Sequence, residues 1–111
     1  MASLTDYSGI VQRLLDERKA FVERTGLDTI ESIHDTVNDR YLLIINTWNG
    51  EKRSYGVFIH IDIVDGKIWI QRDGTEDGVI DDLIKAGVPK EHIVLAYRSP
   101  FVRQFTGFAV S

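Results

Sequence analysis

The sequence predicts one α+β domain over residues 1–111, built from an N-terminal helix, a four-stranded antiparallel meander, a second helix and a short fifth strand. Helical periodicity at the N-terminus is the first observation behind this prediction. The second is a series of alternating segments separated by the turn dipeptides Asn49-Gly50 and Asp65-Gly66, which favour hairpins. A second helical pattern follows the strands, and a length of 111 residues fits a single domain.

The first helix is expected from Leu4 to Arg24. Its apolar residues recur at spacings of three and four and form one stripe. They are Leu4, Tyr7, Ile10, Val11, Leu14, Leu15, Phe21 and Val22. Ser3 is the expected cap, with Asp6 adding negative charge near the helix start. Thr25-Gly26 is the expected end, because glycine accepts the left-handed conformation of a helix terminus.

Four strands should follow this helix. They are expected at Thr29 to Val37, Arg40 to Trp48, Arg53 to Val64 and Lys67 to Arg72. The second of them is apolar on both faces, which favours a central strand covered on both sides. The third alternates between isoleucine on one face and mostly polar or aromatic side chains on the other. Asn38-Asp39 should make the first turn of the meander.

The second helix is expected from about Thr75 to Ala86, with Asp73 as its N-cap and Glu76 completing a pair that resembles a capping box. Ile93 to Tyr97 should form the short fifth strand. The tail from Ser99 to Ser111 should hold a turn of helix and an ordered end. Its aromatic residues, with Tyr97, are expected to close the core over the sheet edge, and an exposed docking patch is the alternative.

Composition restricts the function classes. The net charge is −4 and the pI is about 5.3, which argues against strong direct contact with nucleic acid. The chain has no cysteine, which excludes disulfides, thiolate metal sites and a cysteine nucleophile. No signal peptide and no apolar run of about 20 residues is visible, so a cytoplasmic location without membrane contact is expected.

Four polar residues form a candidate cluster. His60 and Asp62 share one strand face and can begin a metal site, with His34 as third ligand, or an acid/base pair. Asp62, Asp73 and Glu76 can form a nuclease-like carboxylate cluster around Mg²⁺. The favoured interpretation is a solvated face for the first pair and helix capping for the second. We therefore expect no catalytic residue, no metal and no cofactor.

Aromatic and arginine side chains are the candidates for partner binding, because both are enriched in protein interfaces. The candidates are Trp48, Trp69, Arg72, Arg98, Phe101, Arg103 and Phe105. The tryptophans have an alternative role as cross-strand packing partners. A basic strip of Lys52, Arg53, Lys67, Arg72, Arg98 and Arg103 is interpreted as a solvated face rather than a DNA contact. A homodimer is expected for a small sheet with an open edge.

Five blocks of sequence carry a family resemblance. They are Trp48-Asn-Gly-Glu-Lys-Arg-Ser-Tyr-Gly56, His60-Ile-Asp62, Gly66-Lys-Ile-Trp-Ile-Gln-Arg-Asp-Gly-Thr-Glu76, Gly87-Val-Pro-Lys-Glu91 and Phe105-Thr-Gly-Phe-Ala109. In order and spacing they resemble the XisI family of cyanobacterial element-excision controlling factors. That family is named for control of the programmed excision of a DNA element that interrupts the fdxN gene.

The resemblance implies an accessory, regulatory role beside a site-specific recombinase, together with a neighbouring protein, XisH. It implies no catalytic mechanism and no set of active residues. Our first hypothesis is therefore a non-enzymatic regulator of excision that acts through protein–protein contacts with XisH and a recombinase. The alternative is an antitoxin-like partner that binds and neutralises XisH. A further alternative, from another class, is a metal-dependent hydrolase or nuclease that uses His60, Asp62 and Asp73.

Overall fold

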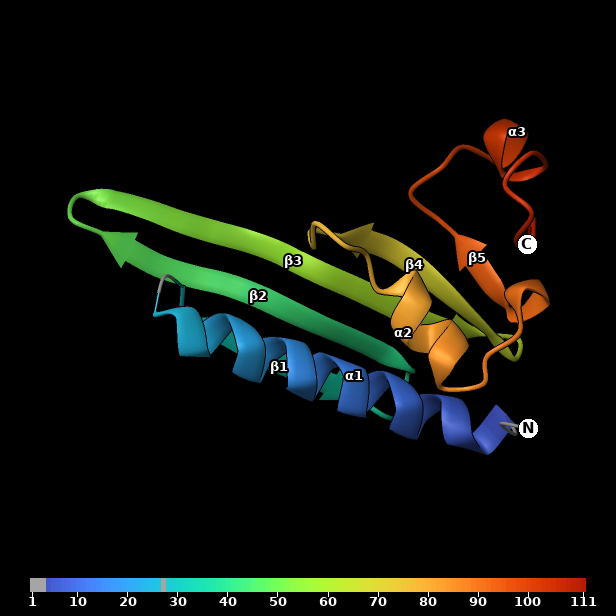
Figure 1. Cartoon of the computed structure of the whole chain (residues 1–111), viewed down its shortest axis with the longest axis horizontal. Helices are drawn as coiled ribbons and strands as arrows, with labels where there is room; N and C mark the ends of the chain where they lie inside the picture. Colours follow the sequence, from blue (N-terminus) through green and yellow to red (C-terminus); the bar gives the residue numbers. More distant parts are fainter. Residues whose placement is uncertain (1–3, 27) are drawn as a thin grey trace.

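A computed structural model describes residues 4–26 and 28–111 and places two helices on one face of a five-stranded sheet (Figure 1). The elements are α1 (Leu4–Thr25), β1 (Ile30–Asp35), β2 (Arg40–Asn49), β3 (Lys52–Val64), β4 (Lys67–Asp73), α2 (Ile80–Lys85), η1 (Lys90–His92), β5 (Ile93–Leu95) and α3 (Pro100–Arg103). The strand order follows the chain. Strands β1 to β4 form the antiparallel meander, and β5 adds a parallel edge strand. The predicted α+β fold is confirmed.

The core lies between α1, α2 and the face of the sheet that these helices cover. Tyr7, Val11 and Leu15 are buried on α1, as the stripe predicts, and Leu83 is buried on α2. The sheet contributes the alternate residues of its central strands: Tyr41, Leu43, Ile59, Ile61, Ile68 and Ile70. Each large apolar side chain buried here contributes about 1.5–3 kcal/mol of transfer free energy. Packing on this single face therefore sets the register of the sheet.

The boundaries of α1 agree with the prediction at its C-terminal end. Gly26 has a φ of 72° and its N–H donates to the carbonyl of Glu23, as expected for a glycine stop. The cap expected from Ser3 and Asp6 lies outside the part of the chain whose side chains are described. No helix in the described part of the chain combines the length and the apolar character that a membrane span requires.

Strand β2 differs from its prediction on one face. Tyr41 and Leu43 point toward the helices, but Leu42 and Ile44 point to the opposite face and stay partly exposed. In the part of the chain that the structure describes, α1 and α2 lie on the other face of the sheet (Figure 1). The expectation of cover on both sides therefore holds for one face only.

The turn that joins β2 to β3 is displaced by one residue from the predicted dipeptide. Asn49 and Lys52 pair across the hairpin, so the turn residues are Gly50 and Glu51. Gly50 has a φ of 65°, the left-handed conformation that the first position of a type II′ turn requires. The second predicted turn is confirmed, because Asp65 and Gly66 both have positive φ.

The predicted start of α2 is wrong by five residues. Asp73 ends β4 rather than capping the helix, and its carboxylate accepts the N–H groups of Thr75 at 3.0 Å and Val79 at 2.9 Å. These bonds hold residues 74–79 as a loop. Gly78, with a φ of 81°, further separates the loop from the helix. The capping-box prediction for Glu76 is also wrong, because this side chain is exposed and forms no hydrogen bond with the described residues.

The tail has the predicted turn of helix, α3, which Ser99 caps by accepting the N–H of Val102 at 3.3 Å. Its end runs beside β5, where Ala109 bridges to Val94. Phe108 packs against the core, but Phe101 and Phe105 are exposed. The expectation that the tail aromatics close the core is therefore right for one of these three rings.

Candidate functional site

His60 and Asp62 lie on the face of the sheet that no described helix covers. His60 pairs across the strands with Leu42, and its Nε2 lies 2.8 Å from Oδ1 of Asp62. The second oxygen of Asp62 accepts the side-chain amide of Gln71 at 3.4 Å. His34 pairs with Tyr41 and so lies on the opposite, helix-covered face. The structure therefore brings His60 and Asp62 together and keeps the expected third ligand away.

The other two polar candidates lie elsewhere. Asp73 is occupied by the backbone of the loop before α2, and Glu76 is exposed on that loop. Among residues 4–26 and 28–111, no three histidine or carboxylate side chains gather closely enough to hold a metal ion. The carboxylate cluster of the nuclease hypothesis is not assembled by these positions.

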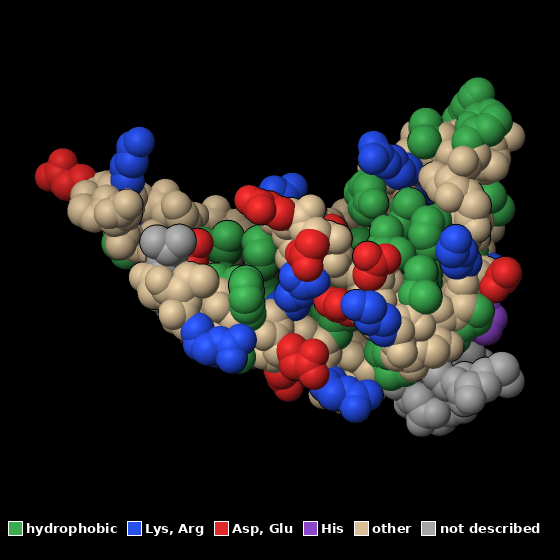
Figure 2. Space-filling model, in the orientation of Figure 1, with side chains coloured by type: hydrophobic (Ala, Val, Ile, Leu, Met, Phe, Trp, Pro, Cys, Tyr) green, Lys and Arg blue, Asp and Glu red, His purple; other side chains and the backbone are tan. Residues whose placement is uncertain are grey.

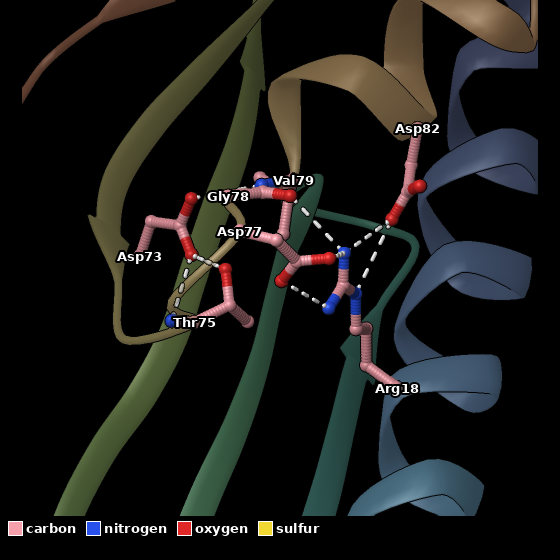
Figure 3. Close-up of polar contacts among 7 residues, drawn as sticks. All are labelled: Arg18, Asp73, Thr75, Asp77, Gly78, Val79 and Asp82. Carbon is pink, nitrogen blue, oxygen red and sulfur yellow. Dashed lines mark hydrogen bonds and ion pairs between the residues drawn. The ribbon is translucent and has the colours of Figure 1, made fainter.

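Arg18 makes a set of long-range polar contacts that local sequence patterns do not reveal. Arg18 on α1 reaches the loop before α2 and the helix itself (Figure 3). Its guanidinium donates to both oxygens of Asp77, at 2.8 and 3.1 Å, and to Oδ2 of Asp82 at 2.8 Å. It also donates to the carbonyl of Gly78 at 3.1 Å. One side chain thus ties α1 to the loop and to α2.

This contact changes the acidity of both partners. The hydrogen bonds from Arg18 hold the pKa of Asp77 below its usual range, and the Asp77 carboxylate raises the pKa of Arg18 despite partial burial. The sequence signal is the position of Arg18 in line with the apolar stripe of α1, four residues after Leu14 and four before Val22. Its partners lie 59 and 64 residues away, where no local pattern can identify them.

An open groove of about 680 Å³ runs beside Arg18, between α1 and the loop before α2. Apolar side chains line its floor and charged side chains its rim. The apolar residues of the floor include Leu14, Val22 and Phe58. The charged residues of the rim include Glu17, Arg24, Glu76 and Asp82. Figure 2 shows carboxylates and basic groups interspersed over this helix-covered face, so the rim has mixed charge.

The predicted partner-binding residues fall into two places. Four of them, Arg98, Phe101, Arg103 and Phe105, lie in the C-terminal segment. There Phe101 is 58% exposed, Phe105 is 73% exposed and their ring centroids are 5.4 Å apart. The hydrophobic end that projects in Figure 2 belongs to this part of the molecule. We call Arg98, Phe101, Phe105 and the exposed Tyr97 the C-terminal patch.

Arg103 has a structural position inside this segment. Its guanidinium donates to the carbonyls of Leu95, Ala96 and Arg98, at 2.9–3.3 Å, and lies 5.4 Å from the ring centre of Trp69. Trp69 is therefore covered by the C-terminal segment rather than free. These contacts fix the C-terminal patch against the sheet.

The remaining candidates lie on the sheet. Trp48 is near the tip of the β2–β3 hairpin, where Arg53 lies 5.7 Å from its ring centre and 4.4 Å from that of Tyr55. Tyr55 was not among the predicted partner-binding residues, although it lies two residues after Arg53 and therefore on the same strand face. Arg72 is exposed on β4 and donates to the carbonyl of Val57 at 2.7 Å.

The six basic residues do not form one strip. Lys52 and Arg53 lie at the tip of the long hairpin, whereas Lys67 lies at the opposite end of β3 and contacts the backbone of Ser111. Arg98 and Arg103 are engaged in the C-terminal segment. This separation supports the interpretation of these charges as parts of different surfaces.

Comparison with known proteins agrees with the fold and extends over nearly the whole chain. No curated protein matches it. One solved structure, the fdxN element excision controlling factor XisI from Anabaena variabilis, is 31% identical with a TM-score of 0.82, and the match covers 97% of this chain and 98% of that one. A XisI-like protein from the same organism is 33% identical with a TM-score of 0.88, covering 98% of this chain and 100% of that one. The sequence model for XisI protein matches residues 1–110, so the chain belongs to the XisI family.

Proposed function

We propose that this chain is a non-catalytic accessory factor that acts through protein–protein contacts in the control of DNA-element excision. The observation that carries this proposal is the C-terminal patch, with two large exposed aromatic rings 5.4 Å apart and Arg98 over the ring of Tyr97. The similarity of the whole chain to the Anabaena excision controlling factor supports a role in excision control. The proposed partner is an XisH-like protein, with a site-specific recombinase as a further member of the assembly.

The two exposed phenylalanine rings provide apolar area that a partner can bury. Phe101 and Phe105 keep most of their surface in water, so burial of each ring on a partner gains about 25 cal/mol per Å² of apolar area. Arg98, which lies 5.2 Å from the ring centre of Tyr97, can add hydrogen bonds at the edge of such a contact. Interfaces concentrate their binding energy in anchors of this kind.

The test is co-purification of this chain with an XisH-like protein, followed by titration calorimetry. The double variant Phe101→Ala and Phe105→Ala should raise the dissociation constant at least about tenfold. Phe21→Ala is the matched control, because Phe21 is an exposed phenylalanine on α1, away from the patch. Equal binding by the wild type and the double variant would refute the assignment of this patch.

The charge of the chain favours a second candidate, in which binding neutralises the partner. A chain with a net charge of −4 can occlude a nucleic-acid-acting protein by covering its basic surface. The discriminating assay measures the activity of the XisH-like protein on nucleic acid as this chain is added. A fall in activity supports neutralisation, whereas unchanged activity with retention of the recombinase supports the accessory role.

A further inference from the structure

The face of the sheet opposite the helices carries a second apolar surface. On this face Ile33 of β1 pairs with Leu42 of β2, and Ile44 of β2 pairs with Val57 of β3. A sheet face that meets water usually alternates to polar residues at these positions. Four neighbouring aliphatic side chains therefore mark the centre of a surface suited to burial.

The same face extends along the long β2–β3 hairpin. Trp48 and Tyr55 are each 64% exposed there, and both belong to the set of alternate residues that point away from the helices. The hairpin reaches past the end of α1, so its tip can lie over another molecule (Figure 1). We use the name open face for Ile33, Leu42, Ile44, Val57, Trp48, Tyr55 and the charged residues in line with them.

The charges at the two ends of the open face complement each other, and Glu31, which pairs with Ile44, lies at the exposed edge of the central row. Arg53 stands at the tip, in the row of Trp48. At the other end, one row contains Asp35, Arg40 and Asp62, which together carry one net negative charge. The tip and this base row therefore have opposite charge, an arrangement that favours one antiparallel orientation of two identical faces.

The spacing of these rows is symmetric about Ile44. Trp48 lies four residues after Ile44 on β2 and Arg40 lies four residues before it, so each end row is about 13 Å from the centre. A two-fold axis through the row of Ile44 and Val57 would place the tip of each copy over the base row of the other. Ile44 and Val57 would then each face their own counterpart, and Leu42 would face Asn46. Glu31, which pairs with Ile44 on the edge strand β1, would face its own counterpart at the rim of the contact.

The area of the open face is close to what a stable dimer needs. Strands β2 and β3 together cover about 33 by 10 Å, and the six residues of β1 add about 20 by 5 Å, which gives roughly 430 Å² of flat surface. The two tip aromatic residues, two-thirds exposed, add on the order of 200 Å². A standard interface buries about 800 Å² on each partner.

We propose that a second copy of this chain packs on the open face and forms a homodimer about the row of Ile44 and Val57. This dimer does not use the residues of the C-terminal patch, although Arg103 of the same segment covers Trp69 beside Asp62, and it does not depend on the proposed function. Each copy buries its aliphatic centre, and each Arg53 meets the acidic row of the other copy. The uncovered side of β2, apolar in the single chain, becomes part of an intermolecular core.

Sedimentation velocity and light scattering on the full chain test this proposal. The expected mass is twice the 12.6 kDa of one chain. Ile44→Lys places a charge at the two-fold axis and should raise the dissociation constant of the dimer at least about a hundredfold. Ile84→Lys is the matched control, because Ile84 is 38% exposed on α2, on the other side of the sheet, and this variant should remain dimeric.

A second variant keeps the test independent of folding defects. Arg53→Glu at the exposed tip should weaken the dimer about tenfold, while the far-ultraviolet circular dichroism spectrum of the folded chain stays unchanged. A wild-type chain that stays monomeric at the highest concentration measured would overturn the proposal. A dimer that persists in Ile44→Lys would place the interface elsewhere and overturn the proposal as well. Dissociation of the Ile84→Lys control would have the same consequence.

Discussion

Replacing Arg18 with alanine should destabilise the protein by about 2 kcal/mol, because this side chain is only 15% exposed and holds α1 to the loop before α2 and to α2 itself. Its pair with Asp77 contributes little, since that carboxylate is 72% exposed. The pair with Asp82, 40% exposed, and the bond to the carbonyl of Gly78 contribute about 1 kcal/mol each.

The assay is thermal unfolding followed by circular dichroism, in which this loss should lower the melting temperature by roughly 10 °C for a chain of this size. Arg13→Ala is the matched control, since Arg13 is exposed on the same helix and forms no ion pair with a described residue. Arg18→Lys should give an intermediate value, because lysine keeps the charge but lacks the planar fork. Equal melting temperatures for Arg18→Ala and Arg13→Ala would refute the reasoning.

Three further predictions use the same unfolding measurement. Gly74→Ala should destabilise the fold by about 1–3 kcal/mol, because a Cβ there would lie 2.7 Å from the ring and 2.8 Å from the carbonyl of Phe58. Gly9→Ala, at an exposed helical site with open space, should instead stabilise it by about 1 kcal/mol. Equal effects of the two variants on stability would contradict this prediction. The pKa of Asp77 is lowered in the folded state, so its contribution to folding stability is complete above the unfolded-state pKa near 4. That contribution is lost as the pH falls through the lower folded-state pKa. A folding stability that stays flat from pH 5 to pH 2 would exclude this contribution. Burial raises the pKa of Tyr7 in the folded state, so its contribution to folding stability is present below about pH 10 and is lost as the pH rises through the higher folded-state pKa. Tyr7→Phe should reduce this loss of stability at alkaline pH.

Patterns with a short range in sequence predicted most of the fold. The stripe on α1 and the alternation in β3 identify the buried face, because helix and strand periodicities directly determine which side chains share a side. The Asp65-Gly66 turn follows from the positive φ that both residues accept. These elements need no knowledge of distant contacts.

The start of α2 shows where such patterns fail. Asp73 and Glu76 satisfy the spacing of a capping box, yet Asp73 lies in β4 opposite Ile59 and uses both oxygens to hold the following loop. The loop is also held from α1 by Arg18, a contact 59 residues away in the chain. Local capping rules cannot include a partner that only the tertiary fold supplies.

The candidate surfaces could be predicted in composition but not in placement. Residue type alone predicted Trp48, Phe101 and Phe105 as partner-binding residues. It could not assign them to different surfaces, because aromatic residues are used both in cores and in interfaces. The structure puts Trp48 on the open face and the two phenylalanines on the C-terminal patch. It also explains why β2 is apolar on both sides while the helices cover only one.

The separation of these two surfaces determines the stoichiometry of any complex. If two copies pair through the open face of β1 to β3, each C-terminal patch, which follows β5 at the other edge of the sheet, stays accessible. The dimer should then bind two partner molecules, and Ile44→Lys should bind one partner per monomer with the same site affinity. A variant that loses the partner together with the dimer would show that both events use one surface, because independent sites do not couple.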